Sequence, residues 1–128
     1  MINFIENGSI TTTPGFKAAG IFAGIKRKRK DLALIYSPRP CNVAGTFTIN
    51  KVKAAPLLLS QEVIKQNGKV KAILVNSGNA NACTGEEGYN DVVLSQKYCA
   101  KLLNINPNEV LVSSTGVIGQ RMPMETLL

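Results

Sequence analysis

The stretch V-L-V-S-S-T-G-V-I-G-Q-R-M-P, residues 110–123, decides how the rest of the chain is interpreted. Val110–Val112 is an apolar run that predicts the end of a buried strand, and a run of small hydroxyl residues follows it up to Gly116. Because glycine has no side chain, the backbone amides at Gly116 and the hydroxyl of Thr115 could face an anion or a developing oxyanion. The alternative is an ordinary strand followed by a Ser-Thr-Gly turn.

The composition predicts one compact domain, residues 1–128, with an aliphatic core. The chain has 128 residues, of which 45% are hydrophobic but only 5% aromatic, and it contains no tryptophan. Apolar runs of strand length alternate with a helical pattern along the chain. The fold class expected from this pattern is mixed α/β (α+β) around a central sheet.

Two residue types limit the chemistry of the chain. It contains no histidine, which excludes a Ser-His-Asp or Cys-His catalytic unit made from this chain alone and removes the commonest metal ligand. The cysteines Cys41, Cys83 and Cys99 are scattered, which indicates free thiols in a reducing compartment, with Cys99 in the core. We expect no metal site, no signal peptide and no membrane span.

Basic residues are concentrated in one run. The net charge is +7, and five of the fifteen basic residues lie at Lys26–Lys30. Flanking apolar segments at Gly20–Ile25 and Leu32–Ser37 predict two strands of a hairpin with the basic run at its solvated tip. The other interpretation is a nucleic-acid-binding patch, although no aromatic residue lies within the run to stack on bases.

The segment after the hairpin predicts a further strand and a short helix. Pro38–Pro40 breaks the strand pattern, and Ala44–Asn50 then alternates in polarity as strands do. Ser60 is a candidate N-cap of a helix that runs through Lys65, and Gly68 is its expected stop.

The second half of the chain predicts a crossover unit. Val70–Val75 is expected to be a central strand, Tyr89–Leu103 an amphipathic helix, and Val110 the start of a parallel strand. The carboxyl ends of such strands collect ligands, so the loop Asn76–Gly85 and the Thr115–Gly116 turn are expected to lie side by side. The asparagines of this loop either contact a substrate or brace their own turns.

The sequence ends inside a helical pattern that begins at Pro123, which indicates one piece of a longer chain. Several segments form a familiar set: G-I-K at 24–26, D-L-A-L-I at 31–35, A-G-T-F-T-I-N at 44–50, A-A-P at 54–56, V-N-S-G-N-A-N-A-C-T-G at 75–85, V-S-S-T-G-V-I-G at 112–119 and P-M at 123–124. In this order they resemble the N-terminal part of the ornithine acetyltransferase family, also called bifunctional glutamate N-acetyltransferases. The match at residues 75–85 is highly specific, and the others are weak alone.

The resemblance implies a self-cleaving precursor whose new N-terminal threonine is the catalytic nucleophile. That threonine takes acetyl from N-acetylornithine and passes it to glutamate through an acetyl-threonine intermediate, in arginine biosynthesis. A terminal amine serves as the base, so no histidine is needed. The resemblance assigns the oxyanion hole to Thr115 and Gly116. The nucleophile lies beyond Leu128, so this chain alone is expected to be inactive.

The resemblance also implies an architecture and partners. It implies a layered sandwich of helices and sheets, of which this chain is an incomplete N-terminal portion of the alpha chain. The partner is a C-terminal beta chain that carries the threonine, in a cytoplasmic heterotetramer of two alpha and two beta chains. It implies no metal and no bound cofactor, and it leaves open whether acetyl-CoA also serves as acetyl donor. The alternatives are a related non-catalytic scaffold and a basic nucleic-acid-binding module.

Overall fold

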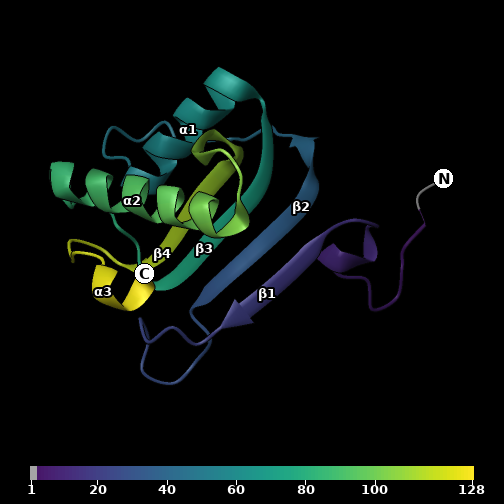
Figure 1. The fold of residues 1–128 in the computed structure, drawn as a ribbon. Helices are drawn as coiled ribbons and strands as arrows, with labels where there is room; N and C mark the ends of the chain where they lie inside the picture. Colours follow the sequence, from purple (N-terminus) through teal and green to yellow (C-terminus); the bar gives the residue numbers. More distant parts are fainter. Residues whose placement is uncertain (1–2) are drawn as a thin grey trace.

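The computed structural model describes residues 3–128, which form a mixed four-stranded sheet with helices packed against it (Figure 1). The strand order is β1-β2-β3-β4, with antiparallel pairing for the first two neighbours and parallel pairing between β3 and β4. This confirms the mixed fold class. The elements are η1 (Ile10–Thr12), β1 (Lys17–Ile21), β2 (Leu32–Asn42), α1 (Ala55–Asn67), β3 (Lys69–Asn79), α2 (Gly85–Leu103), η2 (Pro107–Glu109), β4 (Val110–Val117) and α3 (Met124–Leu127).

The β3–α2–β4 crossover is present as predicted, and β3 is central because it pairs with both β2 and β4. Helix α2 begins at Gly85, four residues before the expected start at Tyr89, and buries Val92 and Cys99 against the sheet. Leu102, which helical spacing predicts to lie near the same face as Val92 and Cys99, is 70% exposed instead. The core is aliphatic as expected, with Val110 fully buried between α2 and the neighbouring strands.

The hairpin of β1 and β2 is confirmed, but both strand boundaries differ from the prediction. Strand β1 ends at Ile21, and β2 continues through Pro38–Pro40 to Asn42. A register shift between Tyr36 and Cys41 carries β2 past the prolines, which have no amide hydrogen to donate to the ladder. The prolines therefore interrupt the pairing of β2 with β3 without ending the strand.

The segment Ala44–Asn50 is not a strand, so its alternating pattern was misleading. No neighbouring strand pairs with it, Phe47 is only half-buried and Ile49 is 99% exposed. Alternation predicts a strand only where a sheet edge is available to satisfy the backbone.

Helix α1 starts earlier than predicted, at Ala55, with Pro56 in its first turn. Ser60 is therefore inside the helix and does not cap it. Its buried hydroxyl donates to the carbonyl of Val112 at 3.0 Å and so joins α1 to β4. The predicted stop is confirmed, since Gly68 adopts the left-handed conformation with φ of +65°.

Candidate functional site at the carboxyl ends of β3 and β4

Thr115 and Gly116 lie within β4 and not in a turn after it, which corrects the predicted strand end at Val112. Strand β3 likewise continues beyond Val75 to Asn79. In the parallel register Thr115 is paired with Ser77 and Gly116 with Gly78. Both Thr115 and Gly116 are exposed. The two sequence segments expected to lie side by side therefore do so, as paired strand ends.

The two strands approach unusually closely at this point, which we call the strand-end corner (Gly78, Asn79, Thr115 and Gly116). Gly116 has a φ of +138°, and a Cβ atom placed on it would lie 2.3 Å from the carbonyl carbon of Gly78 and 2.5 Å from the amide nitrogen of Asn79. Both neighbours are backbone atoms, so no rotamer change relieves the clash. The corner is compatible only with glycine at position 116.

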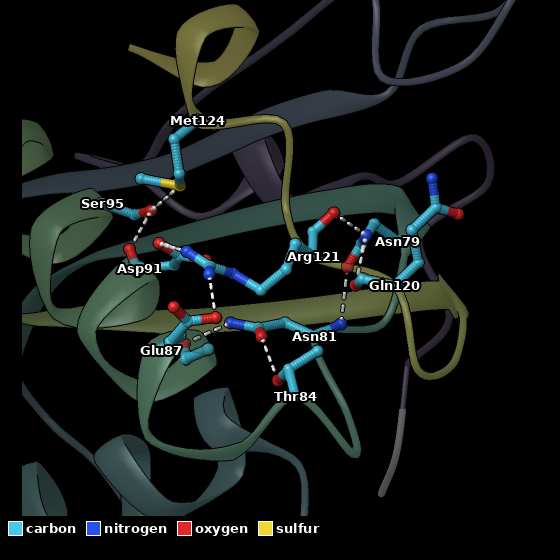
Figure 2. Close-up of polar contacts among 10 residues, drawn as sticks. Asn79, Asn81, Thr84, Glu87, Asp91, Ser95, Gln120, Arg121 and Met124 are labelled. Carbon is cyan, nitrogen blue, oxygen red and sulfur yellow. Dashed lines mark hydrogen bonds and ion pairs between the residues drawn. The ribbon is translucent and has the colours of Figure 1, made fainter.

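Asn79 holds the segment that follows β4 against the corner (Figure 2). Its side-chain amide donates to the carbonyls of Gln120 and Arg121, at 2.9 Å each. Its side-chain oxygen accepts a 2.7 Å bond from the amide of Asn81. The Asn79 carbonyl accepts a further bond from the side chain of Asn76 at 2.9 Å.

Asn81 fastens the same loop to the start of α2. It is 1% exposed, and its side-chain amide donates to the carbonyl of Gly88 at 2.8 Å while its side-chain oxygen accepts from Thr84 at 2.7 Å (Figure 2). With Asn79 and Asn81 occupied in this way, the structure favours the bracing interpretation of the loop Asn76–Gly85.

An ion-pair cluster joins the segment after β4 to helix α2. The guanidinium of Arg121 donates two hydrogen bonds to the buried carboxylate of Asp91, at 2.8 and 2.9 Å, and also contacts Glu87 (Figure 2). The hydrogen bond to Asp91 raises the pKa of Arg121, partly opposed by burial. The sequence does not predict this pair, because Asp91 and Arg121 are 30 residues apart and no local pattern links them.

The basic run lies at the tip of the β1–β2 hairpin with Arg27–Lys30 exposed, as the solvated-tip interpretation predicted, but the base of the tip is fixed in place. Phe22–Lys30, here called the basic loop, folds around the carboxylate of Asp31, which is 3% exposed. That carboxylate accepts from the amides of Ala23 and Lys26 at 2.7 Å and from Gly24 at 3.2 Å. Burial alone would raise the pKa of Asp31, but these amide bonds outweigh it and the pKa is lowered.

Asp31 also ties the basic loop to the strand-end corner. Its carbonyl accepts a 2.8 Å bond from the amide of Ser77, the β3 residue that pairs with Thr115. Figure 1 shows the loop at the end of the sheet where β3 and β4 finish and α3 begins. In the sequence Asp31 stands out as the single acidic residue at the end of the basic run. The sequence does not show that Asp31 contacts Ser77.

The remaining candidates carry little chemistry. Cys41, Cys83 and Cys99 are free thiols, and burial raises the pKa of Cys99. Among residues 3–128 no group of histidine, cysteine or acidic side chains is arranged to hold a metal ion. Nor does any helix in this part of the chain have the length and apolar character needed to cross a membrane.

The fold and the strand-end corner define a mixed α/β protein with an exposed candidate site at the ends of two parallel strands. The sequence model of the ArgJ family matches residues 17–128, and the chain belongs to this family. The arginine biosynthesis bifunctional protein ArgJ of Caldanaerobacter subterraneus is 55% identical over 97% of the chain. The ArgJ 1 protein of Clostridium acetobutylicum is 52% identical over 99%. The chain spans 30% and 31% of the lengths of these relatives.

Solved structures agree with this assignment. The crystal structure of the arginine biosynthesis bifunctional protein ArgJ from Bacillus halodurans matches with a TM-score of 0.92 and 48% identity, over 94% of this chain and 63% of that one. Ornithine acetyltransferase from Mycobacterium tuberculosis, solved in complex with ornithine, matches with a TM-score of 0.85 and 44% identity, over 89% and 62%. The predicted family is therefore confirmed.

Proposed function

We propose that this chain is the N-terminal part of an acetyltransferase that moves acetyl from N-acetylornithine to glutamate, and that Thr115 and Gly116 supply its oxyanion hole. The nucleophile is a threonine hydroxyl carried by a part of the protein outside residues 1–128. Family membership supports the reaction class. The exposed corner supports the role of Thr115 and Gly116, and it is the observation on which the assignment depends.

The proposed chemistry proceeds in two halves. The threonine hydroxyl attacks the acetyl carbonyl carbon of N-acetylornithine and gives its proton to the N-terminal amine. The carbonyl oxygen becomes an oxyanion that accepts hydrogen bonds at Thr115 and Gly116. When the C–N bond breaks, the proton passes to the departing amine and ornithine is released. Glutamate then takes the acetyl group through the same sequence, which regenerates the threonine.

The geometry supports a hole that is rigid before the substrate arrives. The close approach of Gly78 and Gly116 fixes the backbone on one side, and the side chain of Asn79 fixes the segment that follows. Donors that need no reorganisation during the reaction stabilise a developing charge best. In this proposal Asn79 and Asn81 serve catalysis by holding the backbone around the oxyanion hole, and they do not contact the substrate.

The test uses the full-length, self-cleaved protein with Thr115→Ala and, as matched control, Thr115→Ser. Removing one oxyanion donor costs about 10²–10³ in kcat. We expect this loss in the alanine variant and a much smaller one in the serine variant, which keeps a hydroxyl. Because Thr115 is exposed, its removal should change the free energy of unfolding by less than about 0.5 kcal/mol. Unchanged acetyl transfer by Thr115→Ala would refute the assignment.

The proposal extends to the assembly. We propose that the chain functions with a C-terminal beta chain, in a cytoplasmic heterotetramer of two alpha and two beta chains. Neither a metal nor a bound cofactor is needed for the steps above, and acetyl-CoA is a possible alternative donor. Intact-mass measurement of natively expressed protein tests self-cleavage, because two pieces whose masses sum to the precursor are expected.

A further inference from the structure

Residues 117–121, here called the strap, continue directly from the proposed oxyanion hole toward α3. All of them are exposed, so burial of their own side chains does not hold them in place. Hydrogen bonds to the loop after β3 do this instead. The Val117 carbonyl accepts from the amide of Ala80 at 2.9 Å. The Gly119 amide donates to the carbonyl of Ala82 at 2.8 Å. An exposed segment held by few contacts opens easily, so the position of the strap depends on how firmly its far end is fixed.

Arg121 fixes this far end to helix α2. Figure 2 shows its side chain reaching from the strap to the carboxylates of Glu87 and Asp91 on that helix. Its Nε and Nη2 donate to different oxygens of Asp91, at 2.8 and 2.9 Å, and such a two-pronged contact fixes direction as well as distance. The Asp91 side chain is 10% exposed and that of Glu87 is 74% exposed. Because solvent weakens exposed ion pairs, Asp91 is the stronger anchor.

Two glycines make such an anchor necessary. Gly116 and Gly119 both have positive φ, +138° and +76°, and glycine can adopt many other backbone conformations. The chain between the hole and Arg121 therefore does not fix its own path. Asn79 holds the carbonyl of Arg121 at 2.9 Å, and Asp91 holds its guanidinium. With both contacts made, the backbone that leaves Gly116 is constrained at its two ends.

We propose that Arg121 and Asp91 are positioning residues for acetyl transfer: their ion pair holds the strap against α2 and so keeps the donors at Thr115 and Gly116 aimed at the developing oxyanion. Both residues act through the backbone, and neither contacts the substrate. This inference rests on the proposed function and goes beyond it, because it gives a catalytic consequence to an ion pair outside the hole. Oxyanion donors act mainly in the transition state. A loosened strap should therefore lower kcat and leave KM almost unchanged.

The experiment uses the full-length, self-cleaved enzyme and compares Arg121→Met with a matched control. Lys71→Met breaks another ion pair, in which Nζ of Lys71 lies 3.1 Å from Oε1 of Glu109 near the start of β3. Both variants are assayed with N-acetylornithine, below the unfolding temperature of each. Misplacing reacting groups by about 1 Å costs up to about 100-fold in rate. We expect kcat of Arg121→Met to fall about 10–100-fold with KM within about threefold of wild type, while Lys71→Met keeps its kcat.

A conservative variant and two double variants show how the effect reaches the hole. Arg121→Lys keeps the charge but not the two-pronged contact, so its kcat should fall only about 3–10-fold. Adding Arg121→Met to Thr115→Ala should lower kcat by less than about threefold, because the hole that the strap positions is already damaged. Asp91→Asn combined with Arg121→Met should be no slower than Arg121→Met alone. A role independent of Thr115 and Asp91 would multiply the losses instead.

Three results would overturn the inference: wild-type kcat in a folded Arg121→Met variant, an equal loss in Lys71→Met, or losses that multiply in the double variant with Thr115→Ala. If Arg121→Met does not fold or self-cleave, Arg121→Lys decides, and wild-type kcat in that variant also refutes the role of the ion pair. The proposed function fails separately. Unchanged turnover by Thr115→Ala removes the oxyanion hole itself, whereas a slow Thr115→Ala beside a normal Arg121→Met removes only the positioning role.

Discussion

Replacing Gly116 by alanine tests whether the close approach of β3 and β4 shapes the strand-end corner. The new Cβ would lie 2.3, 2.5 and 2.6 Å from backbone atoms of Gly78 and Asn79. A left-handed conformation costs an alanine about 1–2 kcal/mol, and overpacking against atoms that cannot rotate away adds about 1–3 kcal/mol. The expected destabilisation of the β3–β4 pairing is therefore about 2–5 kcal/mol.

Gly119→Ala is the matched control, because it changes the same residue type three positions further on. Gly119 also has a positive φ, +76°, but a Cβ atom there meets nothing within 4 Å. Its substitution should cost only the backbone strain of about 1–2 kcal/mol. The difference between the two variants isolates the steric part, about 1–3 kcal/mol.

Amide hydrogen exchange is the suitable assay, since it reports the opening of β3 and β4 in the full-length protein. A destabilisation of about 2–5 kcal/mol speeds exchange of the paired amides by roughly 30-fold to several thousand-fold. Gly119→Ala should speed it much less. If the two variants exchange equally fast at Val112 and Asn76, the close approach does not constrain position 116, and the reasoning about the corner is wrong.

Two further predictions concern Ser60 and Asp31. Ser60→Ala removes the hydrogen bond from α1 to the Val112 carbonyl and leaves that acceptor buried. We therefore expect amide exchange to show that the free energy of opening of β4 falls by about 1 kcal/mol. The control Ser113→Ala, at an exposed position of β4, should leave this free energy almost unchanged. The lowered pKa of Asp31 means that its contribution to stability is present above about pH 4 and is lost as pH falls through the lower folded-state value. The amides of Ala23 and Lys26 should therefore lose protection in acid, and Asp31→Asn should abolish that pH dependence; protection that stays constant to pH 2 would contradict the role of the Asp31 carboxylate.

Local patterns in the sequence predicted the elements that are determined by local forces. The apolar spacing of α2 and the mostly apolar run Val70–Val75 in β3 predicted an amphipathic helix and a central strand, and Gly68 predicted the end of α1. These signals are reliable because capping, turn preference and the burial of one face depend on residues close together in the chain.

Strand ends and strand identity were predicted less well, because they depend on partners that the local sequence does not contain. Ala44–Asn50 has the alternation of a strand but no neighbour to pair with, whereas β4 continues through Ser113–Val117 because β3 lies beside it. Pro38–Pro40 remains in β2 because a register shift in the pairing with β3 accommodates prolines, which have no amide hydrogen to donate.

For the candidate site, the sequence by itself determined the residue types: a threonine and glycine after an apolar run, a loop rich in asparagine, and a basic run that ends in one acid. Only the tertiary structure decided what these residues contact. Asn79 donates to backbone carbonyls beyond β4, and Arg121 pairs with Asp91. The carboxylate of Asp31 accepts from the amide of Lys26, whose side-chain stem lies beside Gly78. Each of these contacts joins segments that come together only when the chain folds around the sheet, and that is why no local pattern predicted them.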